Sequence, residues 1–192
     1  MKIYDLTQEV FSCIVYPGDP KPEKQTLRAT AAGDLYNLTA FSMCAHNGTH
    51  VDAPFHFIGD GKTVDQLPLE TFVGDCYVAR HQGDVTAEDA KAILDKSNGA
   101  ERILVAGEAV ITAEAARVFA NRGIRLIGNE SQTVGPENAP MEVHLILLGA
   151  DIALLEGVNL KDVPQGTYFL SAAPLNLAGA DGAPCRAYLI QN

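Results

Sequence analysis

The sequence predicts a mixed α/β domain, and three observations lead to this prediction. The first half is rich in short strand-like segments, whereas the second half alternates apolar strands with capped helices. No internal repeat and no Pro/Ser-rich linker divides the 192 residues. We therefore expect one domain over residues 1–192, which is long enough for a substantial core.

Strands and turns are expected in the first half. Residues 2–16 alternate enough for one or two strands. The segment Tyr16-Pro17-Gly18-Asp19 is typical of a type II turn, because proline and glycine occupy its central positions. A short polar passage then leads to a predicted strand over 35–43, and another strand is predicted over 72–79.

The second half shows the start and stop signals of helices. A capping box at Thr86 opens the first helix, Thr112 caps the second, and Pro140 in a first turn marks the third. Glycines end these helices near positions 99, 123 and 149. Strands are predicted over 102–106, 124–127, 152–155, 167–172 and 186–190. The long loops 128–138 and 173–185 are where we expect function.

Composition excludes several classes of protein. The formal net charge of −10 argues against partners such as nucleic acid or anionic membrane surfaces. No apolar run approaches the ~20 residues of a membrane span, and the first residues lack the apolar region of a signal peptide. Four scattered cysteines indicate reduced thiols and a cytoplasmic location. Cys44 lies two residues before His46 and could in principle join a metal site there, but burial as a free thiol is the commoner fate of such a residue.

Residues 46–56 hold three of the five histidines and one carboxylate. His46, His50, Asp52 and His56 all occupy even positions, so an extended strand would point them to one face. Four residues of strand span about 13 Å, which is too far for two imidazoles to share one ion. We therefore expect a bend or bulge at Gly48 that brings His46 and His50 together.

Imidazoles converging with a carboxylate favour a divalent metal, with zinc and manganese the natural candidates. The alternative is a polar surface strand with three satisfied histidines. Two later residues are candidates to complete the site: His144 in the third predicted helix and Glu156 at the end of the next strand. On its own this pair is a weak signal, because a glutamate there is more often a salt-bridge partner.

The segment H-x-G-T-H-x-D-A-P-x-H resembles the signature of the metal-dependent hydrolases of the cyclase family, which includes the bacterial kynurenine formamidases (arylformamidases). The family also has a His and a Glu twelve residues apart, which matches His144 and Glu156. Residues 174–177 and 179–187 resemble the family's ending. The resemblance therefore runs from the Tyr16 turn to the last strand.

This resemblance implies a swivelling β/β/α fold, a homodimer or higher homo-oligomer, and two divalent metal ions. One ion would be held by His46, His50 and Asp52, and the other by Asp52, His144 and Glu156. His56 would be the catalytic acid/base rather than a ligand. The implied reaction is attack of a metal-activated water on a small amide such as N-formylkynurenine. No G-x-S-x-G nucleophile motif offers a competing mechanism.

Three departures from the formamidase pattern lie on the substrate side. Tyr16 stands where formamidases place a tryptophan against the aromatic substrate, and it could instead be a core or interface residue. Glu130 and Thr133 replace an aspartate and a serine, and the segment 107–110 is shorter than the corresponding loop. Shared chemistry with another small amide, a lactam or a cyclic imide is therefore an alternative. A metal-dependent isomerase or cyclase and a non-catalytic binding protein also stay open.

Overall fold

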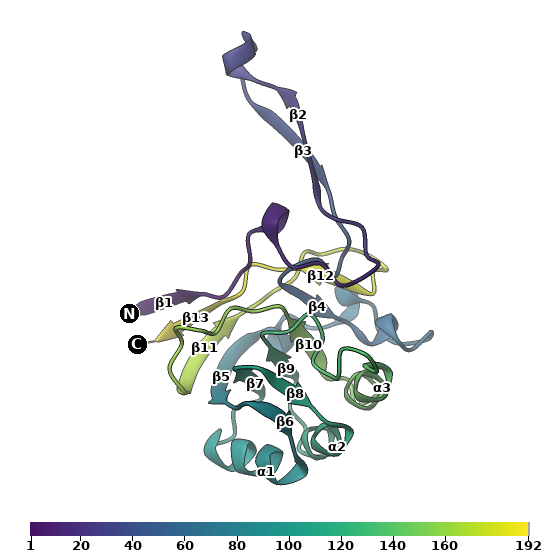
Figure 1. Cartoon of the computed structure of the whole chain (residues 1–192), viewed down its shortest axis with the longest axis vertical. Helices are drawn as coiled ribbons and strands as arrows, with labels where there is room; N and C mark the ends of the chain where they lie inside the picture. The colour runs from purple at the N-terminus through teal and green to yellow at the C-terminus, as the bar shows by residue number, and fades with distance from the viewer. Residues whose placement is uncertain (192) are drawn as a thin grey trace.

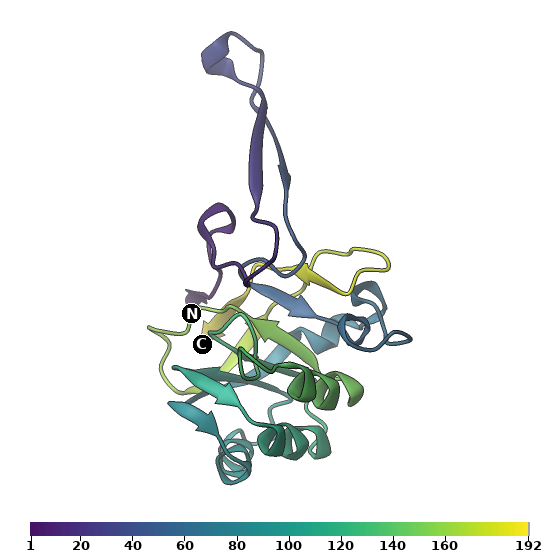
Figure 2. The same ribbon diagram turned by 45° about the vertical axis from the view of Figure 1, so that its right-hand side comes forward.

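A nine-stranded mixed sheet organises the chain in the computed structural model, which describes residues 1–191 (Figure 1). Its strand order is β1-β13-β11-β5-β7-β9-β10-β4-β12. These strands are β1 (Lys2–Asp5), β4 (His50–Asp52), β5 (Val73–Arg80), β7 (Arg102–Ala106), β9 (Leu126–Asn129), β10 (Ala153–Glu156), β11 (Gly166–Ser171), β12 (Gly182–Pro184) and β13 (Tyr188–Gln191). Because β1 pairs with β13, the two ends of the chain lie side by side (Figure 2).

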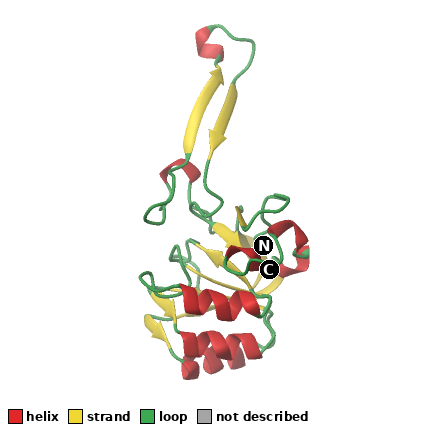
Figure 3. Ribbon diagram, turned by 90° about the vertical axis from the view of Figure 1, so that its right-hand side faces the viewer, coloured by secondary structure: helices red, strands yellow, loops and turns green. Residues whose placement is uncertain are grey.

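The centre of the sheet is parallel because helices connect its strands. β5, β7, β9 and β10 run parallel to one another, and the strands outside this group pair antiparallel. The helices are α1 (Ala87–Lys96), α2 (Ala113–Asn121) and α3 (Met141–Gly149), and they lie side by side on one face of the sheet (Figure 3). The Thr86 and Thr112 side chains accept bonds from the backbone amides of Asp89 and Ala115, so both predicted caps are confirmed.

Alternation along the central strands divides the core into two clusters. On β7, Ile103 and Val105 pack toward the helices, whereas Leu104 packs on the opposite side of the sheet. On β10, Leu154 faces the helices and Leu155 faces away. The same alternation of side chains between the two faces of the sheet determines where the polar residues of β4 and β10 point.

Four strands lie outside the predicted set. β6 (Gly83–Val85) and β8 (Ala109–Ile111) form a small parallel pair, and β12 occupies part of a predicted loop. β2 (Glu23–Arg28) pairs with β3 (Leu38–Ser42) where a polar passage was expected to lead into one strand. Toward the N-terminus, a single strand is followed by a 3-10 helix over Val10–Ser12.

The β2–β3 hairpin projects away from the sheet as an arm, which we define as residues 21–43 (Figures 1 and 2). Its strands carry no alternating apolar pattern because neither face packs on the core, and none of its residues is buried. The strand β2 therefore had no periodic signal in the sequence.

No helix within residues 1–191 is long and apolar enough to cross a membrane. All four cysteines are free, as predicted.

Candidate metal centre and active site

Pairing between β4 and β10 places three acidic or imidazole side chains on one face. Leu154 lies opposite Asp52 and Glu156 lies opposite His50 in this antiparallel pair. Directly opposed residues point to the same side of a sheet. Because Leu154 faces the helices, Asp52, His50 and Glu156 face them too, toward α3.

Helix α3 supplies the fourth member of this cluster. His144 Nε2 lies 3.3 Å from Glu156 Oε1 and 3.6 Å from Asp52 Oδ2. His50 Nε2 lies 3.4 Å from Asp52 Oδ1 and 3.6 Å from Glu156 Oε2. All four side chains are at most 4% exposed. Two imidazoles and two carboxylates thus converge at a buried position.

Backbone carbonyls orient both of these imidazoles. Nδ1 of His50 lies 3.0 Å from the carbonyl oxygen of Gly48, and Nδ1 of His144 lies 2.9 Å from that of Pro140. A carbonyl only accepts hydrogen bonds, so each Nδ1 donates to it and each Nε2 is directed at the carboxylates of the cluster. This is the orientation a metal-binding histidine needs.

The expected bend at Gly48 is present, and it returns His46 to the cluster. Gly48 has a φ of +63°, and a Cβ there would lie 2.8 Å from the Cys13 Cβ. Nδ1 of His46 lies 2.8 Å from Asp52 Oδ1. The extended conformation expected over 46–56 is confined to β4, because the chain turns before it and again after it.

The second turn positions His56. Pro54 opens a 3-10 helix over Pro54–His56, which turns the imidazole back over the cluster. The rings of His56 and His46 have centroids 4.1 Å apart. The His56 side chain is 27% exposed, against 1% for His50, so it is the histidine of this group that is most open to solvent. This position suits an acid/base.

Asp181 joins these two histidines and was not among the predicted site residues. Its Oδ2 lies 2.8 Å from His46 Nε2 and 3.2 Å from His56 Nδ1. Strand β12 brings it there, since Gly182 lies opposite Asp52 and the Asp181 carbonyl accepts from the Ala53 amide. The signal available in the sequence was its place in the loop 173–185, where function was expected.

Charge within the cluster shifts its pKa values strongly. Burial alone lowers the pKa of His46, but Asp52 and Asp181 outweigh it and raise that pKa to about 10. Burial also lowers the pKa of His144, but Asp52 and Glu156 outweigh this effect and raise that pKa to about 10. Burial raises the pKa of Asp52, yet hydrogen bonds from the surrounding imidazoles hold it well below its usual value. Without a cation, protonated imidazoles balance the negative charge of the ionised Asp52.

The residues of the cluster fit a divalent cation. Oδ2 of Asp52 is buried and has no hydrogen-bond partner among residues 1–191, which is a costly state for a carboxylate oxygen. Donor atoms of His50, Asp52 and Glu156 lie within 4.8 Å of one another, and so do those of His46, Asp52 and His56. Asp52 belongs to both groups, as a bridging ligand would. Mixed imidazole and carboxylate donors suit zinc and manganese.

Cys44 is directed elsewhere. Its Sγ lies 3.8 Å from Asp19 Oδ2, and it belongs to neither of the two groups found among the described residues. The thiol is therefore not part of this cluster.

A cavity of about 240 Å³ opens onto the cluster, and its wall includes Tyr16, Phe57 and Thr133. The Tyr16 hydroxyl donates to the Glu137 carbonyl at 2.9 Å, which holds the ring in the wall. Thr133 is 3% exposed, and its hydroxyl has no partner. Glu130, in contrast, accepts from backbone amides and lines a separate hollow. Two of the three departures from the formamidase pattern therefore place a residue in the wall of this cavity, namely Tyr16 and Thr133.

Fold and cluster together define a class: mixed α/β proteins with a histidine–carboxylate centre beside the last parallel strand. A family model described as "Putative cyclase" matches residues 4–136, and the chain belongs to this Cyclase family. The family expected from the histidine-rich segment is confirmed.

Named relatives cover nearly the full chain. The kynurenine formamidase of Sphingopyxis alaskensis is 34% identical over 207 residues, which cover 98% of this chain and 97% of that protein. That of Erythrobacter litoralis is 32% identical, with 98% and 93% covered. The solved structure of isatin hydrolase A from Labrenzia aggregata, bound to benzyl benzoate, superposes with a TM-score of 0.85 at 26% identity, covering 98% of this chain and 93% of that one. A solved protein described as a potential metal-dependent hydrolase with cyclase activity has a TM-score of 0.83 at 29% identity, with 98% and 96% covered. The expected fold class is confirmed.

Proposed function

We propose that this chain is a metal-dependent amide hydrolase whose whole length, residues 1–192, forms one catalytic domain. The observation that carries the proposal is the buried Asp52, shared by two ligand groups beneath a cavity that exposes His56. Full-length relatives named as kynurenine formamidases support the same reaction class. We place the protein in the cytoplasm because its four cysteines are free.

Two divalent ions, zinc or manganese, are proposed as cofactors. His46, His50 and Asp52 would hold one ion, and Asp52, His144 and Glu156 the other. Such ions polarise a carbonyl oxygen and lower the pKa of a coordinated water.

His56 is proposed to move the protons of the reaction. Asp181 accepts the hydrogen of His56 Nδ1, which leaves Nε2 free as a base. Nε2 takes a proton from the attacking water and returns it to the leaving nitrogen. The carbon–nitrogen bond breaks, the hydroxyl stays on the acyl carbon, and the amine leaves with the proton. Asp181 is thus a positioning residue, and His56 is the catalytic one.

N-formylkynurenine is the first substrate we propose, and hydrolysis would release formate. Tyr16 offers a ring for an aromatic substrate, and the unpartnered Thr133 hydroxyl offers a hydrogen bond in the same cavity. Another small amide, a lactam or a cyclic imide is the second candidate. The similarity to isatin hydrolase A and the departures at Tyr16 and Thr133 support this second candidate. We also propose a homodimer, as the family resemblance implies.

Elemental analysis of tag-free protein tests the metal centre. We expect about two ions per chain, falling to about one in His144→Ala, together with hydrolysis of the loaded wild type. Absence of bound metal after incubation with Zn²⁺ and Mn²⁺ would overturn the proposal. Mass spectrometry of the product separates the reaction classes, because hydrolysis adds the mass of one water and isomerisation leaves the mass unchanged.

A further inference from the structure

The proposed reaction leaves unused a group of hydrogen bonds just beyond the paired parts of β4 and β10. These strands pair as far as His50 and Glu156, so Thr49 and Gly157 are the next two opposed positions. Thr49 is buried, and its hydroxyl donates to the Gly157 carbonyl at 2.7 Å. A side chain therefore extends the link between the two strands that carry proposed metal ligands.

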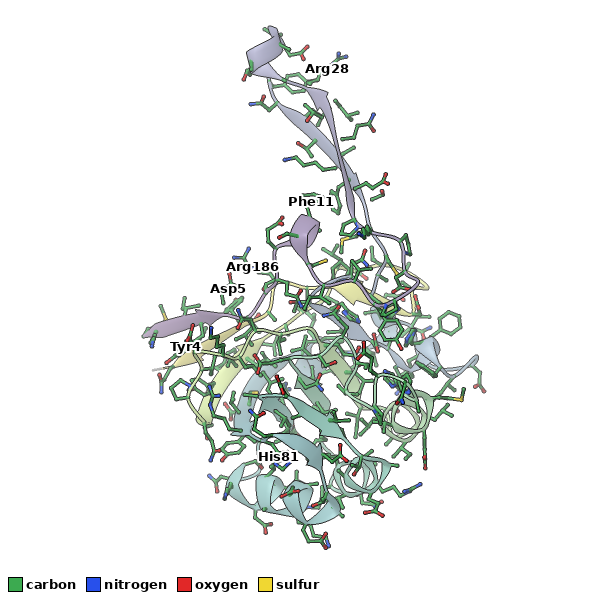
Figure 4. The ribbon with its side chains drawn as sticks, in the orientation of Figure 1. Tyr4, Asp5, Phe11, Arg28, His81 and Arg186 are labelled. Carbon is green, nitrogen blue, oxygen red and sulfur yellow. The ribbon has the colours of Figure 1, made fainter. Side chains whose placement is uncertain are left out.

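Gln8 joins the same group from the N-terminal segment, which runs from Asp5 to Phe11 between β1 and the arm (Figure 4). Its backbone amide donates to the Thr49 hydroxyl at 2.9 Å, and its Nε2 donates to the Gly157 carbonyl at 2.8 Å. Both lone pairs of that carbonyl oxygen are then occupied. The N-terminal segment is thus fixed to both strands.

Gln132 completes the group from the loop between β9 and α3. Its neighbours determine the orientation of its amide. Nε2 donates to the carbonyls of Gly48 at 3.2 Å and Ile14 at 3.1 Å, and Oε1 accepts from Gln8 Nε2 at 3.0 Å. The same side chain lines the cavity above the metal centre. We call the side chains of Gln8, Thr49 and Gln132 the brace.

Gly157 leaves the space in which the brace is assembled. Its φ is +66°, and a Cβ there would overlap the Gln132 amide and the Gly48 carbonyl oxygen. A residue without a side chain is therefore needed directly after Glu156 for the two glutamines to meet.

The brace acts on the metal centre through the carbonyl of Gly48. That oxygen accepts from Gln132 Nε2 and lies 3.0 Å from His50 Nδ1. Groups that bond to the second ring nitrogen of a metal-binding histidine fix the orientation of its ring. Because Gln132 holds the carbonyl that holds His50, it influences where Nε2 of that imidazole points.

The other buried ligands have anchors of their own. Glu156 Oε1 accepts from the Val134 amide at 2.8 Å, and His144 Nδ1 donates to the Pro140 carbonyl at 2.9 Å. Neither bond involves the brace. Removing the brace should therefore disturb His50 more than Glu156 or His144.

We propose that Gln132 and Thr49 are positioning residues that hold His50 for one of the two ions. The inference rests on the proposed function, in which His50 belongs only to the ligand set that it forms with His46 and Asp52. Loss of the brace weakens binding of that ion and spares the other. The brace thus gives the two ions separate supports within one centre.

Chelator competition on the tag-free, zinc-loaded protein tests this selectivity. The wild type should give two dissociation constants for Zn²⁺. Gln132→Met removes the amide but keeps a side chain of similar length, so one constant should rise about 10–100-fold while the other stays unchanged. Thr49→Val should act in the same direction. Thr49→Ser, which keeps the hydroxyl, should retain both wild-type constants.

Gln82→Met is the matched control, because Gln82 lines the separate hollow beside Glu130. Its two constants should equal those of the wild type. Unchanged constants in Gln132→Met would overturn the proposal. An equal rise of both constants would overturn it as well, since that result indicates a general loss of structure. Equal losses in Thr49→Val and Thr49→Ser would show that the hydroxyl has no positioning role.

Hydrogen exchange in the metal-free, ¹⁵N-labelled chain separates this inference from the proposed function. The Nδ1 hydrogen of His50 should exchange slowly with water, because it is bonded to the Gly48 carbonyl and its side chain is buried. It should exchange faster in Gln132→Met. Equal exchange in the two proteins would overturn the positioning role, even if both bind two ions. Faster exchange in a chain that binds no metal would contradict the proposed function and still support the positioning of His50.

Discussion

Asp52 is completely buried, whereas Leu35 at the tip of the arm is 97% exposed. Each is the reverse of what its side chain favours in a folded protein. Around Asp52 the chain supplies imidazoles and a second carboxylate but leaves one carboxylate oxygen unpaired. Around Leu35 it supplies a rigid turn but no surface to pack against. In both regions the backbone and neighbouring side chains are well positioned, but one group lacks an interaction partner. Asp52 needs a partner for a charged oxygen, whereas Leu35 needs an apolar surface.

Changes in the metal centre and changes in the arm should therefore separate cleanly. Variants of the centre should alter turnover or metal content at constant molecular mass. Variants of the tip should leave turnover and metal content unchanged. The predictions below test the first half of this contrast, from the largest effect to the smallest.

The largest effect is expected for His56→Ala. Turnover should fall by about 10²–10⁴-fold, because the group that transfers the protons is lost. Metal content should stay at the wild-type level, since the proposed ligand sets do not include His56. Simultaneous loss of metal and turnover would instead make His56 a ligand, consistent with its closeness to His46 and Asp52.

Asp181→Asn should have a smaller effect, about 10–100-fold on kcat, as is typical when a residue that orients a catalytic or ligand imidazole is lost. A purely structural role would lower the thermal stability and leave kcat of the metal-loaded enzyme unchanged. Asp151→Asn is the matched control, because Asp151 lies on the surface, where it pairs with Lys62.

Thr133→Val removes a hydroxyl while keeping the shape of the side chain. We expect KM for the true substrate to rise about 3–10-fold with kcat nearly unchanged, as for the loss of one neutral hydrogen bond. Comparing formamides with cyclic imides in this variant would show which substrate uses the hydroxyl. Equal KM values for Thr133→Val and the wild type with every substrate would remove Thr133 from the substrate site.

Stability against pH gives the mildest test. The pKa of His46 and of His144 is about 10 in the folded chain and near 6.5 when unfolded. The protonated forms therefore stabilise the metal-free protein fully below pH 6.5, and this contribution is lost as pH rises toward 10. Calorimetry should show the metal-free Tm falling by a few degrees over this range. The loaded protein should keep its Tm, because the ions replace the protons. An arm variant should behave like the wild type here.

Local patterns in the sequence predicted the elements that build the site, because those elements obey local rules. Alternation indicated that His50 and Asp52 share a face, and Gly48 was expected to bend the chain back. The capped helices and buried strands of the second half follow from their own periodicity. The ligand partition and the role of His56 came from the family resemblance and stay predictions.

What the sequence did not reveal depends on pairing between distant segments. Asp181 reaches His56 across 125 positions, because β12 pairs with β4, and β12 has no strand pattern of its own. The arm escaped prediction for the opposite reason. Its strand β2 has the sequence Glu-Lys-Gln-Thr-Leu-Arg and buries neither face. The segment therefore lacks the hydrophobic periodicity that would predict a strand.

With the proposed ligand sets, the pairing of Asp52 with Leu154 would also determine when the protein can acquire its cations. During synthesis the histidine-rich segment leaves the ribosome long before His144 and Glu156 exist. A complete set of ligands forms only after nearly the whole chain has emerged and β4 has inserted beside β10. Loading would therefore be a late step that captures the finished fold and stabilises it by mass action. In a metal-poor cell, newly made chains should thus accumulate in a less stable form that proteases remove first.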